Sequence, residues 1–265
     1  MDWSGRSNSS QKKRDEQSIL QIIGLCKSFG EVQAADEVGF TIHAGDLTAI
    51  IGPNGAGKTT LFNLITGYLQ PNSGRVLFEG MEITGLPVRD ICRRGIGRSF
   101  QVAEVFPRLS VFDSLQVALL SKHKRHLNLF AGVKDLFREE VLSLLEMMGL
   151  SQNAHNLCAA LARGDQKKLD ITMALAIGSR ILILDEPVAG SSPEETLQIT
   201  SLLSKLVNQF GMTIVFSEHD LDVVFGIATT IIVMHEGRII ACDTPQEIRK
   251  NRKVQKVYLG EFTDA

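Results

Sequence analysis

A glycine-rich stretch at residues 52–60 constrains the fold more than any other part of the sequence. It matches the pattern G-x-x-x-x-G-K-[ST], with an apolar run at 47–51 before it and a helix-compatible run at 61–66 after it. In that strand–loop–helix context the pattern indicates a phosphate-binding loop, because glycines let main-chain N–H groups converge on phosphate oxygens. A helix that begins near Lys58 adds the positive end of its dipole. We expect the phosphate contacts to come from Gly52, Pro53, Asn54, Gly55, Ala56, Gly57, Lys58, Thr59 and Thr60.

Two side chains at the end of this stretch have distinct predicted tasks. Lys58 supplies a positive charge for the β- and γ-phosphates, and the Thr59 hydroxyl supplies an oxygen ligand for Mg²⁺. The alternative is a glycine-rich turn that carries a solvated lysine. The flanking strand and helix patterns make that alternative the weaker interpretation.

Length and composition exclude several other classes of protein. The chain has 265 residues, enough for one large domain, and its formal net charge of −2 gives no sign of a nucleic-acid partner. Four cysteines without a C-x-x-C pair predict reduced thiols rather than a disulfide framework or a zinc site. No apolar run approaches the ~20 residues that span a bilayer. Residues 1–18 are polar, lack the apolar centre of a signal peptide, and are expected to form a disordered tail.

A second candidate site follows the apolar run at 181–184, where Asp185 and Glu186 stand next to each other. A short, fully apolar run predicts a central parallel strand that delivers these acids at its carboxyl end. Adjacent side chains on a strand point to opposite faces, so we expect the two carboxylates to have different roles. Asp185 suits a Mg²⁺ partner and Glu186 suits activation of water. The alternative, an ordinary strand-end turn, is weakened by the phosphate-loop pattern earlier in the chain.

Three further residues are candidate site residues only because of the motifs around them. His219 follows a predicted strand at 212–216 and is expected at the same sheet edge as Asp185, although a lone histidine there is usually structural. Phe29 precedes a turn at Gly30, and an aromatic side chain there could stack on a nucleotide base, although a lone phenylalanine is more often core. Gln101, at the end of the strand predicted at 95–101, carries no functional signal by itself.

The rest of the chain alternates between predicted strands and helices. A helical insert occupies about 102–160, and its basic residues 122–126 are interpreted as a solvated loop. The expected strands are 19–29, 38–42, 47–51, 75–78, 95–101, 181–184, 212–216, 231–234 and 238–241. The expected helices are 61–66, 111–120, 133–148, 167–176, 193–209 and 244–250, with Gly67 and Gly211 as helix ends, Pro193 in a first turn and Thr244 as a cap.

Taken in order, these motifs resemble the ATP-binding subunit of ATP-binding-cassette (ABC) transporters, over about residues 19–260. The resemblance implies an α/β fold of the P-loop NTPase type, with a mostly parallel core sheet, an antiparallel β subdomain and a helical subdomain at about 102–172 within one ATPase domain at 19–262. It implies that Phe29 stacks on adenine and residues 52–60 hold the phosphates of ATP. Thr59 and Gln101 would contact Mg²⁺ and the attacking water, and Asp185 would hold Mg²⁺ through water. Glu186 would be the catalytic base, and His219 would contact the γ-phosphate.

Finer features resemble the branched-chain (hydrophobic) amino-acid uptake systems. These are Ser99-Phe100-Gln101 followed by 105–111, the run 193–196, the run 219–226 and the ending 258–261. The ATPases of urea uptake and of lipopolysaccharide export share parts of this pattern. An ABC ATPase that serves no transporter and a nucleotide sensor that does not hydrolyse ATP are the alternatives from other classes.

The resemblance also implies partners and a place in the cell. These are a second ABC ATPase subunit, identical or different, two integral membrane permeases that face the segment after Gln101, and a substrate-binding protein, with no nucleic acid. The location would be peripheral, on the cytoplasmic face of the cell membrane. ATP and Mg²⁺ are the implied cofactors.

The chain departs from the family at the signature segment, which in the family contacts the nucleotide held by a partner. The family pattern is Leu-Ser-Gly-Gly-Gln, and here the segment is Leu161, Ala162, Arg163, Gly164 and Asp165. Ala162 lacks the serine hydroxyl, and the Asp165 carboxylate is a like-charge neighbour for polyphosphate. Met173 stands where a basic residue is usual. We therefore hypothesise an asymmetric pair, in which this chain's phosphate-binding loop, completed by a different partner's signature, is the faster site.

Overall fold

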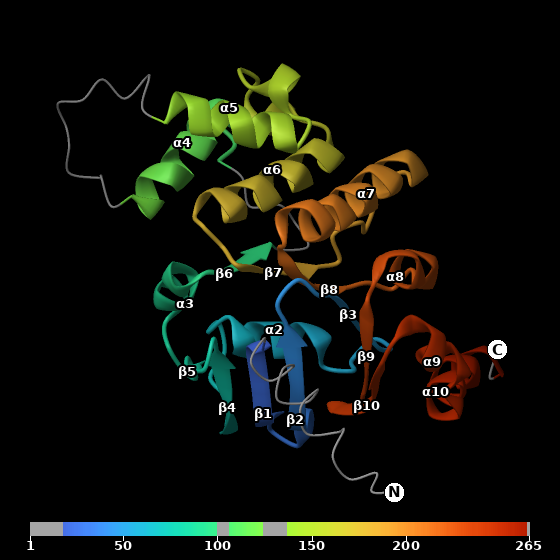
Figure 1. Ribbon diagram of the computed structural model, residues 1–265. Coiled ribbons are helices and arrows are strands. Elements are labelled where there is room, and N and C mark those ends of the chain that lie inside the picture. The colour runs from blue at the N-terminus through green and yellow to red at the C-terminus, as the bar shows by residue number, and fades with distance from the viewer. Residues whose placement is uncertain (1–17, 100–105, 124–136, 264–265) are drawn as a thin grey trace, which may run out of the picture.

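The computed structural model describes residues 18–99, 106–123 and 137–263, without the side chains of 259–263. Gln101, most of the predicted tail and most of the basic stretch at 122–126 lie outside the described residues. Ser18, the last residue of the predicted tail, begins the first strand instead. Figure 1 shows two sheets in the lower half of the molecule and a group of helices above them.

A six-stranded sheet forms the centre, in the order β10-β9-β3-β8-β7-β6. All neighbouring strands are parallel except β9 and β10, so the predicted mostly parallel core sheet is confirmed. Three interior strands are buried along their whole length, which is why their sequences are continuous apolar runs. The strands are β3 (Leu47–Ile51), β6 (Ile96–Ser99), β7 (Ile181–Asp185), β8 (Thr213–Ser217), β9 (Thr230–His235) and β10 (Arg238–Asp243).

A second, four-stranded sheet is antiparallel throughout, in the order β2-β1-β4-β5. Its strands are β1 (Ser18–Phe29), β2 (Val32–His43), β4 (Ser73–Phe78) and β5 (Met81–Glu82). The strand predicted at 38–42 therefore starts six residues earlier, at Val32. Helix α2 (Lys58–Ile65) lies between the two sheets (Figure 1), and its buried side chains Leu61, Phe62 and Ile65 share one apolar cluster with both.

The upper helices come from the middle of the chain. They are α4 (Val111–Lys122), α5 (Arg138–Met147) and α6 (Arg163–Ala176), with short 3₁₀ turns at Ser151–Asn153 and Cys158–Ala160. Helix α6 starts four residues earlier than the predicted 167–176, so the signature segment runs into its first turn rather than preceding it. Its N-terminal end therefore presents residues 163–165 from a helix and not from a loop.

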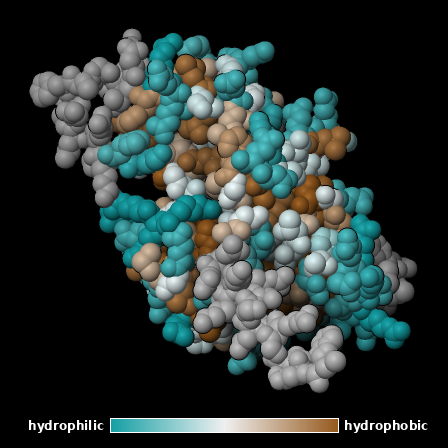
Figure 2. All heavy atoms as spheres, in the orientation of Figure 1, coloured by the Kyte–Doolittle hydropathy of each residue, from teal (hydrophilic) through white to brown (hydrophobic). Residues whose placement is uncertain are grey.

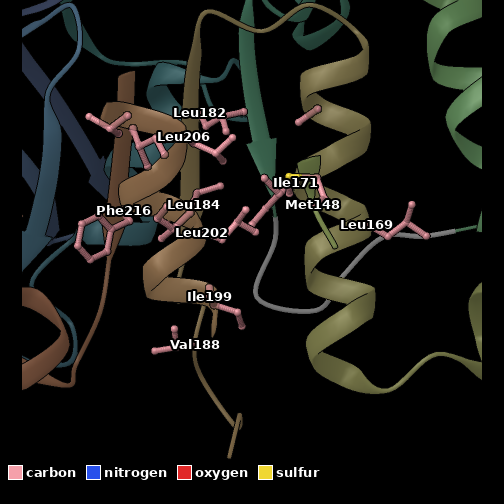
Figure 3. Packing of buried hydrophobic residues seen from close by; sticks show 14 of the residues in the cluster. Met148, Leu169, Ile171, Leu182, Leu184, Val188, Ile199, Leu202, Leu206 and Phe216 are labelled. Atoms are coloured by element: carbon pink, nitrogen blue, oxygen red, sulfur yellow. The ribbon is translucent and has the colours of Figure 1, made fainter. Parts of the chain in front are cut away.

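Helix α7 (Pro193–Phe210) packs between these helices and the central sheet. Figure 3 shows its apolar side chains facing strand side chains on one side, with helix α6 on the other. Full burial of one such side chain contributes about 1.5–3 kcal/mol. The labelled residues are Met148, Leu169, Ile171, Leu182, Leu184, Val188, Ile199, Leu202, Leu206 and Phe216.

The remaining helices are short or lie at the chain's end. Thr244 is in the cap position of α9 as predicted, but its side chain makes no capping hydrogen bond. Helix α7 starts at Pro193 and has Gly211 as its C-cap, both as predicted, and its last residue, Phe210, lies one residue beyond the predicted 193–209. Three helices were not predicted: α3 (Val88–Arg94), α8 (Leu221–Ile227) and α10 (Arg252–Thr263); α9 spans Pro245–Lys250.

The surface is consistent with burial of apolar side chains in these clusters. Figure 2 shows hydrophilic residues over much of one face, with hydrophobic residues visible between them. Within the described ranges, none of the helices combines the length and the apolar character that a bilayer crossing requires.

Candidate functional site

The glycine-rich loop joins β3 to α2 and lies tightly against two other strands. A Cβ atom on Gly52 would be 2.2 Å from the Met234 carbonyl oxygen, and one on Gly57 would be 2.1 Å from the Ala34 carbonyl oxygen. Gly57 also has a φ of 101°, in the left-handed region, at the N-cap of α2. The loop conformation therefore requires glycine at both positions, and its packing against β2 and β9 fixes the start of the helix.

Lys58 places a charged side chain inside this loop. Its residue is 7% exposed, and its Nζ donates hydrogen bonds to the carbonyl oxygens of Gly52 at 2.6 Å and Pro53 at 3.2 Å. Burial lowers the pKa of Lys58, while the charges of Glu186 and Asp185 act in the opposite direction. The loop thus holds a buried ammonium group in the field of two carboxylates, and this group can donate charge-assisted hydrogen bonds to an anionic ligand.

Asp185 ends strand β7, at the sheet edge where sequence analysis placed it. The residue is 8% exposed, and its Oδ1 accepts a hydrogen bond from Ser217 Oγ at 2.8 Å. Its Oδ2 lies 3.6 Å from Arg98 Nη2. The carboxylate is therefore held from two neighbouring strands, β8 and β6, at their carboxyl ends.

Arg98 is a site residue that sequence analysis missed. From β6 it also donates to Asn63 Oδ1 at 2.6 Å and Thr66 Oγ1 at 2.9 Å, so it connects Asp185 with the helix that follows the glycine-rich loop. Burial lowers its pKa, and the Asp185 charge opposes that effect. The available signal was an arginine inside a predicted strand of otherwise small and apolar residues.

Glu186 faces a different environment from Asp185, as predicted, but the predicted reason is wrong. We expected alternation along a strand, whereas Glu186 lies beyond β7 and has a φ of 50°. A left-handed backbone at a non-glycine residue costs of the order of 1 kcal/mol, and the Glu186 N–H donates to the Ser217 carbonyl oxygen at 3.1 Å. This turn brings Glu186 Oε1 to 2.9 Å from His219 Nε2.

His219 therefore lies at the same edge as the two carboxylates, as predicted. Two interactions connect these residues with the glycine-rich loop. Lys58 of the loop interacts electrostatically with Glu186 and Asp185, and Glu186 is hydrogen-bonded to His219. Phe29 is 48% exposed, so its ring is not core, and Lys27 Nζ lies 5.3 Å from the ring centroid.

The signature segment makes no hydrogen bond to the glycine-rich loop within the part of the chain that the structure describes: none joins residues 161–165 to residues 52–60. Ala162 is the N-cap of α6 without a side-chain hydrogen bond, Arg163 is exposed, and Leu161 and Gly164 are buried. Asp165 Oδ1 lies 3.1 Å from Lys168 Nζ, and its Oδ2 accepts from Asn153 at 3.3 Å, so part of its charge is offset within the chain.

Two more charged residues near the site carry no role in the sequence analysis. Glu218 is 4% exposed, and its Oε1 accepts a hydrogen bond from the Val188 N–H at 2.7 Å. Lys167 Nζ donates to the Ala189 carbonyl oxygen at 2.6 Å. Burial raises the pKa of Glu218 and lowers that of Lys167. The signal for Glu218 was a carboxylate directly after an apolar strand; Lys167 had no local signal.

A glycine-rich loop between a strand and a helix, with acids and a histidine at the ends of neighbouring parallel strands, defines a P-loop nucleotide-binding domain. The chain belongs to the ABC transporter family, whose model matches residues 35–189. It is an ATPase of that family, and the predicted resemblance and fold class are confirmed. A further family model, described as "Branched-chain amino acid ATP-binding cassette transporter", matches residues 238–262.

Named relatives and solved structures agree with this assignment. The chain is 37% identical over 254 residues to "High-affinity branched-chain amino acid transport ATP-binding protein LivG" of Escherichia coli K12, covering 92% of this chain and 99% of the relative. It is 38% identical to the protein BraF of Pseudomonas aeruginosa, which has the same description, covering 92% and 98%. A nucleotide-free ATP-binding cassette from an ABC transporter superposes with a TM-score of 0.77 at 32% identity, covering 91% of this chain and 98% of that one.

Proposed function

We propose that this chain is the ATP-hydrolysing subunit of a membrane importer for branched-chain or other hydrophobic amino acids. The observation that carries the substrate class is the identity of 37% and 38% with two nearly full-length relatives that are named for branched-chain amino acid transport. The family model at residues 238–262 supports the same class from a different part of the chain.

The residues of the glycine-rich loop would bind the phosphates of ATP. Main-chain N–H groups of the loop and the start of α2 supply hydrogen bonds and a positive dipole end, and Lys58 supplies a charge. The donor set also fits Mg²⁺, because the Thr59 hydroxyl and the Asp185 carboxylate are oxygen ligands of the kind that this hard cation takes, with Gln101 as a third. When bound, Mg²⁺ neutralises negative charge on the phosphate oxygens. Phe29, with an exposed ring, would stack on the base.

Glu186 would act as the general base for the attacking water. Its Oε1 is held 2.9 Å from His219 Nε2, so the carboxylate has a defined direction before the nucleotide binds. His219, the partner of Glu186 in this hydrogen bond, would contact the γ-phosphate. Because phosphoryl transfer depends mainly on positioning and on stabilising charge, a base fixed by a second side chain is the feature the reaction needs.

The signature residues Leu161, Ala162, Arg163, Gly164 and Asp165 would act on a nucleotide held by a second ABC ATPase subunit, since no hydrogen bond of the described residues joins them to this chain's own loop. Our hypothesis of an asymmetric pair follows from the missing hydroxyl at Ala162 and the carboxylate at Asp165. The other partners would be two membrane permeases and a substrate-binding protein, with this chain on the cytoplasmic face of the membrane. The domain organisation in this proposal is one ATPase domain at 19–262, with helices α4–α6 in a helical subdomain at about 102–172.

The test is transport by the assembled complex. The chain is purified from membranes with its partners and reconstituted into vesicles, and ATP-dependent uptake of radiolabelled leucine is measured for the wild type and for Glu186→Gln. We expect uptake with the wild type and a loss of more than tenfold with the variant. ATP-dependent movement of urea or of lipopolysaccharide, with no leucine uptake, would replace the proposed substrate class.

A further inference from the structure

The segment that follows Glu186 is held by two charged side chains from different parts of the fold, the buried Glu218 and the partly buried Lys167. On one side the Glu218 carboxylate accepts a hydrogen bond from the Val188 N–H at 2.7 Å. On the other side the Lys167 ammonium donates to the Ala189 carbonyl oxygen at 2.6 Å. A carboxylate thus holds one main-chain donor, and an ammonium holds the acceptor one residue later.

Glu186 needs such support because its backbone is strained. Its φ of 50° is maintained by main-chain hydrogen bonds to the Ser217 carbonyl oxygen and from the Ala189 N–H to the Glu186 carbonyl oxygen, each 3.1 Å long. A strained residue persists only where its surroundings fix it. Ala189 takes part in this turn through its N–H, so the Lys167 hydrogen bond to the Ala189 carbonyl acts on the same peptide segment that fixes Glu186.

The two charged side chains connect the Glu186 segment to two different parts of the chain. Glu218 stands between strand β8 and His219, and its Oε2 also accepts from the His219 N–H at 3.3 Å. It therefore joins the Glu186 segment to the histidine that Glu186 contacts. Lys167 belongs to α6, whose first residues are the end of the signature segment. It therefore joins the Glu186 segment to the signature.

A second contact fixes α6 against the same part of the chain. A Cβ atom on Gly164 would lie 2.9 Å from Glu195 Oε1, so the first turn of α6 is packed directly on this carboxylate. Glu195 Oε2 accepts from the Ser192 N–H at 2.8 Å within the capping box of α7. Helix α6 therefore contacts residues 189–195 at two points that are about one helical turn apart, Gly164 against Glu195 and Lys167 against Ala189. Two such contacts restrict the position of α6 more than one contact would.

We propose that Lys167 and Glu218 are positioning residues that hold the 187–189 segment between them, so that the orientation of α6 sets the direction of the Glu186 carboxylate. The proposal rests on the proposed function, since it assigns a regulation to the base of the same site. A shift of α6 together with its neighbouring helices pulls on the Ala189 carbonyl, while Glu218 keeps the Val188 end fixed. The direction of the Glu186 carboxylate then depends on the position of α6.

The charges of the two groups support this arrangement. Glu218 is buried and Lys167 is partly buried, and burial is the main cause of the raised pKa of Glu218 and of the lowered pKa of Lys167. Each lies in the field of the other, which opposes both effects. Removing the Lys167 charge leaves the buried Glu218 carboxylate less compensated, and removing either side chain takes away one of the two hydrogen bonds that hold this segment, so each variant should affect the segment that both hold.

The test uses the complete transporter with its partners and compares three substitutions in this chain. Lys167→Met keeps the unbranched stem and removes the donor, whereas Lys167→Arg keeps a donor. Lys205→Met is the matched control, because Lys205 Nζ also donates to a main-chain carbonyl, that of Met147 at 3.4 Å, away from the site. ATP turnover, KM for ATP and thermal midpoint are measured for each.

We expect Lys167→Met to lower kcat about tenfold with KM within twofold of wild type, since misplacing a reacting group by about 1 Å can cost up to about a hundredfold. Lys167→Arg should restore most of the turnover, and Lys205→Met should leave it unchanged. A wild-type kcat for Lys167→Met, or a loss that Lys167→Arg does not rescue, would overturn the proposal.

Glu218 supplies an independent measurement if a Lys167 variant does not assemble. Glu218→Gln keeps an oxygen for the Val188 N–H and should reduce kcat less than Glu218→Ala does; equal effects would refute the positioning role. The variant Glu186→Gln distinguishes a failure of the proposed function from a failure of the positioning role. If Glu186→Gln leaves ATP turnover unchanged, Glu186 is not the general base and the proposed function fails. If Glu186→Gln stops turnover but Lys167→Met does not lower turnover, only the positioning proposal fails.

Discussion

Two regions of this chain differ in how firmly the fold specifies them. The phosphate-binding side comprises residues 52–60 with Asp185 and Glu186, and the signature side comprises residues 161–165. The glycine-rich loop is packed so closely against β2 and β9 that Gly52 and Gly57 admit no side chain, and Asp185 is held from two neighbouring strands. The signature contains Ala162, a helix cap without a capping side chain, followed by the exposed Arg163. The difference teaches that the fold specifies the glycine-rich loop and Asp185 tightly, while it specifies the signature segment weakly.

The largest expected effect is on the phosphate-binding side, at Glu186. Replacing Glu186 by Gln removes the general base while keeping the shape of the side chain, so we expect ATP turnover to fall about a thousandfold. ATP binding should remain, because the loop and Lys58 are unchanged. Phosphate release and fluorescent-nucleotide binding measure the two quantities. Retained multiple-turnover hydrolysis would show that Glu186 is not the base.

The second effect, also on the phosphate-binding side, is on nucleotide affinity. Lys58→Ala removes a buried, charge-assisted hydrogen-bond donor, and we expect the Kd for ATP to rise about thirtyfold. Equilibrium binding with a fluorescent ATP analogue measures it. Lys250→Ala, at an exposed lysine paired with Glu247, is the control and should not change the affinity. Equal affinities for the two variants would remove Lys58 from the phosphate site.

Smaller effects are expected on the signature side, where a substitution could improve the site. Asp165→Gln removes a carboxylate that would face a partner's nucleotide, and we expect turnover at that nucleotide to rise about two- to fivefold. The gain is limited because Lys168 and Asn153 already offset part of the charge. The measurement is made in a complex that carries Glu186→Gln in this chain, so that only the other site turns over. Asp165→Glu keeps the charge and should give no gain; a gain from it would rule out the electrostatic explanation.

The smallest expected effect is on stability. Ala162→Ser supplies a capping hydroxyl at the start of α6, which should stabilise the chain by about 0.5–1 kcal/mol. Denaturant unfolding measures the change. The control Ala160→Ser is at an exposed position outside the cap and should have no effect. An unchanged stability in both variants would mean that the α6 N-terminus is satisfied in another way.

Sequence patterns predicted the parts of the fold that local rules determine. Strands β3, β7 and β8 were found because burial on both faces produces short, continuous apolar runs, and α7 was found from Pro193 and Gly211 at its ends. The short helices α3 and α8, of seven residues each, escaped prediction because few turns give little periodicity. Asp220 caps α8 with its side chain, a signal that was available.

The candidate site was predicted less completely, because pairing between distant segments builds part of it. Arg98 meets Asp185 only through the parallel pairing of β6 with β7. Lys167 and Glu218 meet the segment after Glu186 only because α6 and the end of β8 converge on it. No local pattern contains that information. The turn at Glu186 was also missed, since a positive φ at glutamate has no sequence signature.

The most direct test of the account compares the two ATP sites of one reconstituted transporter. Glu186→Gln is introduced in this chain, and the corresponding glutamate of the partner ATPase is replaced by glutamine in a separate complex. ATP turnover is then measured for both. Because this chain's phosphate-binding side would be joined to the better signature, we predict a loss at least tenfold larger for Glu186→Gln than for the partner's substitution. Equal losses would contradict the account.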